Sequence, residues 1–495
     1  MSAPDPKAVL AGLLRLAGLD ETMLGDIALT GAEPALPSSF AVSTAAQAAI
    51  AAAALAAARL WRLRAGRRQR VSVDMRDAAI EFRSERYLRV DGKYPADDPD
   101  RLSGLYRCGD GRWVRLHTSL PHHYRGMLGL LRSADDRAAV QRALDHWEGE
   151  ALEAAAADAG LVAAACRSFA EWDRHPQGRA IAALPLLSIE QIGDAPPEAL
   201  SAAERPLAGI RVLDLTRIIA GPVCGRTLAV HGADVLLVSA SHLPSLRPLV
   251  IDTGRGKLSA FIDLREARGR EALAVLARAA DIFVQGYRPG AIAALGFGPE
   301  EVAKIRPGIV YVSLCAYGHH GPWAERRGFD SLVQTASGFN AAEAEAFGAS
   351  EPKPLPGQAL DHATGYLMAF AAMAALIHRA ERGGSWHVRV SLAQTAHWLR
   401  WLGRIDGIAC SVIRSLTTCA TAWRRRRPDS ATSRRSVTPP SWTKHRRTGR
   451  GQAFRSERIR PRGRTEKSYR EQRSARTSAT RRANVCASPG QRAET

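Results

Sequence analysis

The stretch Gly357-Gln-Ala-Leu-Asp-His-Ala-Thr-Gly365 places an acid, Asp361, where a helix is expected to begin. Unpaired backbone N–H groups at a helix start favour the charged form of an acid. The apolar run from Tyr366 to Ile377 predicts that a core holds this helix. A fixed, ionised carboxylate at the mouth of a core is what covalent acyl chemistry needs, so Asp361 is a candidate nucleophile. A simple helix-capping role for Asp361 is the alternative.

An earlier segment of the chain resembles the one that holds Asp361. Residues 41–79 align without gaps with residues 358–396 at an offset of 317, and each copy predicts a long helix, a glycine turn and a strand. Chance similarity between two alanine-rich helices is the alternative. Thr44 aligns with Asp361. The repeat therefore predicts that the first copy carries the scaffold without the carboxylate, which leaves one active centre per chain.

The basic character of the chain lies in its last part. Residues 411–495 contain 23 of the 69 Lys and Arg residues but only 5 of the 49 Asp and Glu residues, so they carry +18 of the net charge of +20. Three interpretations remain open for this segment: a nucleic-acid-binding arm, a solvated disordered tail, or an out-of-frame translation of GC-rich DNA. Regular aromatic interleaving is absent, so nucleic acid is disfavoured as a partner. We expect a disordered tail that does not define function.

Cysteine usage and apolar runs suggest where the protein works. The seven cysteines show no CxxC and no Cys/His ligand spacing, which argues against zinc and fits a reducing cytoplasm. The start of the chain lacks a basic region followed by an apolar core, so no signal peptide is predicted. The run from Ala45 to Leu60 is alanine-rich with arginines at its end, and we expect a buried helix there rather than a membrane span.

The order of the expected elements predicts an α/β protein. Residues 76–200 are mixed, with a hairpin around residues 109–110, and a linker follows at 194–204. Helices are expected near 122–132, 136–146, 149–159 and 169–178, and beyond the linker at 222–231 and 266–279, with strands at 210–216, 234–238, 257–264, 281–284 and 309–314. Strands separated by helices predict a Rossmann-like parallel sheet with helices on both faces, preceded by a mixed α/β half-domain. The first strand-to-helix turn lacks GxGxxG, so no dinucleotide cofactor is indicated.

Several later segments, taken in order, resemble the class III CoA-transferase family, which includes CaiB/BaiF, formyl-CoA and carnitine CoA-transferases. The first is Pro206-Leu-Ala-Gly-Ile-Arg-Val-Leu-Asp-Leu-Thr-Arg-Ile-Ile-Ala-Gly-Pro222, and the others are residues 228–235, 284–290, 295–298, 328–334 and 383–391. Residues 70–192 resemble the later half of such chains more weakly. The resemblance thus implies a C-terminal-type half without the nucleophile at 1–200, an N-terminal-type catalytic domain at 206–405, and the basic tail at 411–495.

By this resemblance Asp361 falls on the family's catalytic aspartate. The implied reaction moves CoA from an acyl-CoA to a carboxylic acid: the carboxylate attacks the thioester, and the released CoA then forms an aspartyl-CoA thioester. Coenzyme A is thus a substrate, and no permanently bound cofactor is implied. Backbone N–H groups near Gly357 or the helix start are expected to stabilise the developing oxyanion. Asp330 falls where the family places a second acid, and a purely structural role for Asp330 stays open.

The resemblance also implies where CoA lies, along the strand ends of the Rossmann-like unit. The implied contacts are Ile219, Ala220, Asp263, Arg265, Gly286, Tyr287, Arg288, Arg326, Arg327 and Phe329. The arginines among them suit CoA phosphates, although each alone also fits a solvated surface role. Ala240 and Ala294 stand where family members can carry phosphate-binding arginines, and the family's glycine-rich covering loop is not recognisable.

Two other functions stay open. Acyl-CoA racemases of the same fold read Gly-His-Asp where this chain reads Gly328-Phe329-Asp330. Phenylalanine cannot exchange protons, so transfer is favoured over racemisation. His319, His320 and His362 lie nearby and could substitute for the racemase histidine, but we expect each to be a surface or capping residue. An inactive scaffold or basic binding protein is the alternative from another class. The family's interlocked dimers imply a homodimer, although the order of the halves would also let one chain complete its own domain.

Overall fold

The computed structural model describes residues 4–95, 100–405 and 441–442. Contacts divide the chain into Met1–Arg446 and Arg447–Thr495, and all the described residues belong to the first unit. Within the basic segment only Ser441–Trp442 (β13) is described, and it pairs antiparallel with β2 (Val71–Asp74). The predictions for the rest of 411–495 lie outside the described residues.

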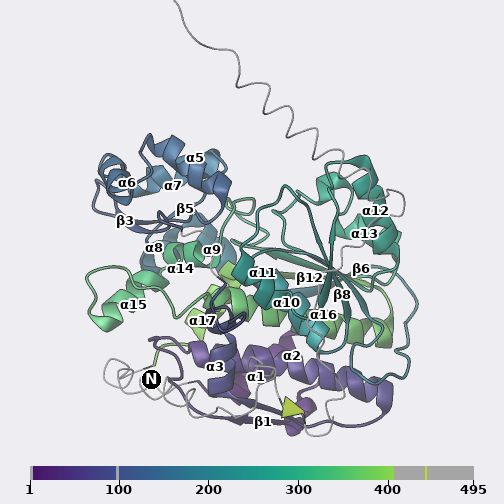
Figure 1. Cartoon of the computed structure of the whole chain (residues 1–495). Coiled ribbons are helices and arrows are strands. Elements are labelled where there is room, and N and C mark those ends of the chain that lie inside the picture. The colour runs from purple at the N-terminus through teal and green to yellow at the C-terminus, as the bar shows by residue number, and fades with distance from the viewer. Residues whose placement is uncertain (1–3, 96–99, 406–440, 443–495) are drawn as a thin grey trace, which may run out of the picture. The chain divides into compact units, whose positions relative to one another are not determined.

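The central sheet has seven strands in the order β6-β12-β11-β10-β7-β8-β9. Figure 1 labels three of them, β6, β8 and β12. Their bounds are β6 Leu187–Gly193, β7 Arg211–Leu215, β8 Asp234–Ser239, β9 Lys257–Phe261, β10 Ile282–Gln285, β11 Val310–Cys315 and β12 Ser385–Ser391. Every neighbouring pair is parallel except β6 with β12. The parallel sheet of the prediction is therefore confirmed. Strand β6 was not predicted, and it brings the first 200 residues into this sheet.

Alternate residues of the strands serve two different cores. Val212, Ile282 and Val310 pack into a core that includes α10 (Ala220–Val230) and α16 (Ala359–Arg382). Their neighbours Leu213, Phe283 and Tyr311 pack into a second core with α12 (Ala267–Arg278) and α13 (Pro299–Ile305). Because successive side chains of a strand point to opposite faces, helices cover both faces of the sheet, as predicted.

The two long alanine-rich helices confirm the internal repeat. Helix α2 (Val42–Ala65) and α16 each have 24 residues, begin 317 residues apart, and end at Gly66 and Gly383. The elements that follow also correspond, because β2 and α3 (Met75–Glu81) match β12 and α17 (Leu392–Trp401). Both helices are long and apolar enough to cross a membrane. However, the most apolar 18-residue stretch of α2 is 94% buried inside the protein and that of α16 is 100% buried. They pack against each other in the core.

A small antiparallel sheet carries the rest of the first half. Strands β3 (Gly104–Arg107) and β4 (Trp113–Leu116) form the predicted hairpin, and β5 (Ala163–Ala165) pairs with β4. Helices α5 (Pro121–Leu131), α6 (Arg137–Leu144) and α7 (Gly149–Asp158) cover one face and share its core. Strands β4 and β5 also contact α14 (Asp330–Ala336), the helix that begins with the second candidate acid.

The predicted helix over 169–178 is two helices, α8 (Phe169–Arg174) and α9 (Pro176–Ala182). Pro176 has no N–H to continue α8, and it forces His175 into an extended conformation. The remaining elements are α1 (Pro6–Leu16), η1 (Glu21–Asp26), β1 (Ile27–Thr30), α4 (Ser84–Tyr87), α11 (Arg247–Thr253), η2 (Ala293–Leu295) and α15 (Phe339–Phe347).

Candidate active site

The two candidate acids meet at the start of α16. Asp361 is the third residue of the helix, and the helix cap is Gln358, so Asp361 does not cap its own helix. Asp330, the first residue of α14, accepts the N–H of Asp361 at 2.8 Å and also accepts the N–H of Leu360. Asp330 therefore caps α16 from a neighbouring helix, and this position holds it beside Asp361.

This arrangement overturns the expectation that the helix start keeps Asp361 charged. Burial raises the pKa of Asp361 well above its ordinary value, and the nearby carboxylates of Asp330 and Glu85 raise it further. Burial also raises the pKa of Asp330, to about 6, against the hydrogen bonds that lower it. The free N–H groups that were expected to stabilise Asp361 are used by Asp330. The pair thus retains a proton at a pH where isolated acids would be ionised.

One backbone donor does serve Asp361, and it comes from another helix. The N–H of Ala220, the first residue of α10, donates to the Asp361 carboxylate and lowers its pKa in part. Gly365 permits this approach, because a Cβ at that position would lie 2.5 Å from the Ala220 carbonyl oxygen and 2.7 Å from Val223 Cβ. Just before α10, Ile218 has a φ of +76°, which a β-branched residue adopts only under strain.

The oxyanion donors predicted near Gly357 or the helix start stay a prediction. The Ala220 N–H adds a backbone donor at the first turn of the Rossmann-like unit. This turn holds the predicted CoA contacts Ile219 and Ala220, which are both buried. The acid and the turn are brought together by the packing of α10 on α16. Because the Ala220 N–H can donate a hydrogen bond to the Asp361 carboxylate, it could also donate one to a negatively charged acyl oxygen in the same place.

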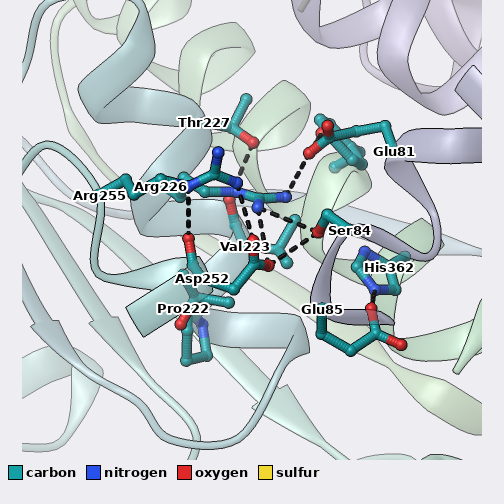
Figure 2. Close-up of polar contacts among 12 residues, drawn as sticks. Glu81, Ser84, Glu85, Pro222, Val223, Arg226, Thr227, Asp252, Arg255 and His362 are labelled. Carbon is teal, nitrogen blue, oxygen red and sulfur yellow. Dashed lines mark hydrogen bonds and ion pairs between the residues drawn. The ribbon is translucent and has the colours of Figure 1, made fainter. Parts of the chain in front are cut away.

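The residue after the candidate nucleophile is fixed by the first half of the chain. His362 Nε2 lies 3.0 Å from the Glu85 carboxylate in α4, and both side chains are buried (Figure 2). Burial raises the pKa of Glu85, but the hydrogen bond and attraction to His362 outweigh it and leave that pKa below its usual range. His362 is therefore neither a surface nor a capping residue, contrary to expectation.

A buried ionic network joins the same segment to α10 and α11. Arg226 donates to Asp252 at 2.9 Å and to Glu81 at 2.5 Å, and Ser84 donates to Asp252 at 2.7 Å. Figure 2 shows the Arg226 guanidinium between these groups. Tyr366 of α16 also donates to Glu81. A buried charge that lost its partner would be costly, so this network holds α3 and α4 in place beside the site.

Three arginines gather at the carboxyl ends of the strands. Arg217 follows β7, Arg288 follows β10, and Arg327 precedes α14; all three are exposed. Partial burial of the Arg327 guanidinium lowers its pKa, and the charges of Arg288 and Arg217 lower it further. Within residues 4–95 and 100–405, none of the three forms an ion pair with a carboxylate, so their charges are free to bind an anion.

Two of these arginines were predicted and one was missed. Arg217 stands directly after a buried strand, which is the signal that would have found it. Predicted Gly286 and Tyr287 lie in the same turn as Arg288, and burial raises the pKa of Tyr287.

The other predicted contacts lie elsewhere or already have partners. Arg265 forms an exposed ion pair with Asp263, at 2.6 Å. Arg326 lies over the Trp323 ring, 4.3 Å from its centroid, and 3.9 Å from Glu153. Phe329 stacks on His117 with ring centroids 4.0 Å apart. Sequence reasoning missed His117, since residues 100–131 are separated from Asp361 by more than 200 positions.

Comparison with known proteins identifies the family. The model of CoA-transferase family III matches residues 16–201 and 207–403, so the chain belongs to this family. It is 37% identical over 215 residues to acetyl-coenzyme A transferase nodX of Hypoxylon pulicicidum. The matched region covers 42% of this chain and 36% of that protein. It is 34% identical over 193 residues to succinyl-CoA:glutarate CoA-transferase of Mus musculus, which covers 36% of this chain and 43% of that protein.

One solved structure is also similar to part of this chain. The protein in the crystal structure of Rv3272 from M. tuberculosis is 34% identical in sequence, and its TM-score is 0.37. The match covers 40% of this chain and 57% of the Rv3272 chain. In the two relatives above, the chain thus spans less than half of the protein that it matches. Among the residues that the structure describes, no group of three or more His, Cys, Asp or Glu residues could hold a metal ion.

Proposed function

We propose that this protein is a CoA-transferase that moves CoA from an acyl-CoA to a carboxylic acid, with Asp361 as its nucleophile. One observation supports the proposal above the others. The Asp361 carboxylate lies between a backbone donor, the N–H of Ala220, and a second acid, Asp330. That is the set of groups that covalent acyl transfer requires: a nucleophile, an oxyanion donor and a group that can hold its proton.

The reaction follows from these groups. Ionised Asp361 attacks the thioester carbonyl, the C–S bond breaks, and a mixed anhydride and the CoA thiolate form. The thiolate attacks the aspartyl carbonyl, which releases the first acid and leaves an aspartyl-CoA thioester. The acceptor carboxylate attacks that thioester, and the returning thiolate then attacks the acyl carbonyl of the new anhydride, which regenerates Asp361.

The raised pKa of Asp361 gives this reaction a pH dependence. Attack needs the carboxylate, and burial together with Asp330 and Glu85 favours the neutral acid. Activity is therefore expected to rise as the pH rises through the pKa of Asp361. We propose that the Arg217, Arg288 and Arg327 heads bind the phosphates of CoA, which places its thiol end toward α16.

We also propose that residues 1–200 complete the site within the same chain. Glu85 from α4 reaches His362 of α16, and β6 closes the edge of the catalytic sheet. The homodimer remains a prediction, and light scattering of the purified chain would test it.

Trapping of the covalent intermediate tests the proposed function. The full chain is incubated with a panel of acyl-CoAs, treated with hydroxylamine and digested for mass spectrometry. A hydroxamate at Asp361, absent in Asp361→Asn, is the expected result. A folded chain that gives no adduct with any acyl-CoA, in the presence of added acid, would overturn the proposal and favour the inactive scaffold.

One observation favours a second candidate, acyl-CoA racemisation. The His117 ring stacks on Phe329, the residue that takes the place of the racemase histidine, and burial lowers the pKa of His117 to about 4. A neutral imidazole can remove a proton. Exchange of the α-proton of a 2-methylacyl-CoA for deuterium in D₂O, in the absence of acceptor acid, would establish this reaction.

A further inference from the structure

The outer face of the small sheet presents polar side chains toward the start of α14. Along β4, Val114 and Leu116 point into the small core, so Arg115 lies on the opposite face. That face contacts α14, whose first residue is Asp330. The Asp330 charge acts on the Arg115 guanidinium, although burial lowers the pKa of Arg115 overall. A half-buried cation thus lies within electrostatic range of the paired acids.

Two histidines line the same place. His117 stacks on Phe329, and His123 of α5 meets the edge of that ring with centroids 5.9 Å apart. Burial lowers the pKa of His123 to about 3, and the charges of neighbouring His122, His117 and arginines add to the effect. Both imidazoles are therefore neutral near pH 7, and each offers one N–H donor and one acceptor nitrogen.

Three polar atoms of this cluster have no hydrogen-bond partner among the residues that the structure describes. They are both ring nitrogens of His123, which is 3% exposed, and the buried Nε of Arg115. Buried polar side chains are normally paired, because an unpaired group has lost its hydrogen bonds to water without gaining others. Unpaired donors of two residues beside one aromatic wall indicate a binding site for a polar ligand.

Charge decides what that ligand is. The acid substrate must bring a carboxylate to Asp361, close to the carboxylates of Asp330 and Glu85, which repel it. The reacting carboxylate loses its charge when the anhydride forms, so a fixed cation paired with it would oppose the reaction. A second carboxylate at the far end of the substrate keeps its charge throughout, and a permanent cation serves that group best.

We propose, on the basis of the proposed CoA transfer, that Arg115, His117 and His123 bind the acid substrate, and that this acid is a short dicarboxylic acid. The distal carboxylate lies on the Arg115 guanidinium and accepts an N–H from His123. The stacked rings of His117 and Phe329 contact the methylenes between the two ends. The near carboxylate then faces Asp361 and reacts with its thioester.

Charge and geometry of Arg115 are separated by two variants. Arg115→Gln removes the cation, and Arg115→Lys keeps the charge but loses the planar fork. Arg112→Gln is the matched control, because Arg112 stands one residue before β4 and pairs with Glu171 at 3.0 Å, away from Asp361. Thermal unfolding of each variant establishes that it is folded. The KM of each variant is then measured for two dicarboxylic acceptors, succinate and glutarate, and for two monocarboxylic acceptors, propionate and butyrate. The donor in every assay is one acyl-CoA that labels Asp361.

Arg115→Gln is expected to raise the KM for the dicarboxylic acids by about 10-fold or more, since a charged hydrogen bond is lost. The same variant should leave the KM for the monocarboxylic acids within about twofold of the wild-type value, and hydroxylamine should still give a hydroxamate at Asp361. Arg115→Lys should give a KM for the dicarboxylic acids between those of the wild type and Arg115→Gln. Arg112→Gln should show none of these changes. The inference is overturned if Arg115→Gln affects both acid classes equally or neither, or if the wild type prefers monocarboxylic acids. Absence of any adduct at Asp361 in the wild type would instead contradict the proposed function.

Discussion

The starts of α2 and α16 are two copies of one structure, and only one of them can do chemistry. In α16 the Asp330 carboxylate accepts the N–H of Asp361, and in α2 the Glu33 carboxylate accepts the N–H of Thr44 at 2.6 Å. Both caps come from outside their helix, although Glu33 and Asp330 are not related by the repeat offset. The geometry at the helix start is therefore retained where the nucleophile is absent.

What differs is the surroundings. Thr44 is fully buried, whereas Asp361 keeps 7% of its surface exposed and accepts the N–H of Ala220. Helix α10 packs on α16, and the strand-end arginines lie in the same Rossmann-like unit. A capped helix start is thus a structural solution in both copies, and the neighbouring turn makes one of them a site.

The largest expected effect comes from removing the one carboxylate that distinguishes the copies. Asp361→Asn should lower the rate of CoA transfer by roughly 10³-fold or more, because an amide cannot form the acyl intermediate. Thr44→Val is the matched control at the corresponding position and should leave the rate unchanged. Steady-state rates of thioester exchange check both. A transfer rate of Asp361→Asn within tenfold of the wild type would contradict the role of Asp361.

The contact between α10 and α16 can be broken at one glycine. Gly365→Ala places a Cβ 2.5 Å from the Ala220 carbonyl oxygen, so α10 must move and carry the Ala220 N–H away from Asp361. We expect a loss of about 1–3 kcal/mol of unfolding free energy and a lower kcat. Position 48 corresponds to 365 and is alanine, so Ala48→Gly is the control; it should cost up to about 1 kcal/mol through helix propensity and leave kcat unchanged. Equal kcat values in the two variants would show that the contact has no role in the reaction.

The charge of the cap can be removed while its hydrogen bonds remain. Asp330→Asn keeps an oxygen that accepts the N–H groups of Leu360 and Asp361 but removes one of the charges that raise the pKa of Asp361. The increase of kcat/KM with pH, which follows the ionisation of Asp361, should therefore occur at lower pH in the variant. A pH–rate profile of wild type and variant checks the direction, and a shift to higher pH would contradict the coupling of the two acids.

The smallest expected effect is at the copy without the nucleophile. Burial raises the pKa of Glu33 above its usual value, against the hydrogen bonds of Ser43 and Thr44. A raised folded pKa means that the neutral form stabilises the fold at low pH and that this contribution is lost as the pH rises through the folded pKa. Glu33→Gln should flatten this dependence, and Glu33→Ala should cost about 1 kcal/mol. Thermal unfolding between pH 4 and pH 8 measures both, and CoA transfer by Glu33→Gln at pH 7 should equal that of the wild type.

Much of the fold could be predicted from local patterns. The strands that form the parallel sheet, the β3–β4 hairpin and the two repeated helices follow from apolar periodicity and glycine positions, which act over a few residues. Strand β6 and the break at His175 were missed. The first pairs with β12 almost 200 residues later, and the second depends on a proline inside an apparently continuous helix.

The candidate site was predicted only in part, for the same reason. Asp361, Asp330, Arg288 and Arg327 carry local or family signals, whereas Glu85, Arg115 and His123 come from segments whose sequence says nothing about their distance from Asp361. His362 was expected at the surface or as a cap and is buried against Glu85. Ion pairs between distant segments form only where the packing of whole helices brings them together.

Local sequence patterns establish which residues can react, where most strands and helices lie, and that one copy of the repeat lacks its carboxylate. These properties depend on residue type and on neighbours along the chain. The state of Asp361 depends instead on the packing of distant segments. Its pKa is raised because packing buries it and places Asp330 and Glu85 around it, while α10 brings the N–H of Ala220 to the same oxygen atoms. Burial and the electric field at an atom depend on every group near it in space, and most of those groups are far away along the chain.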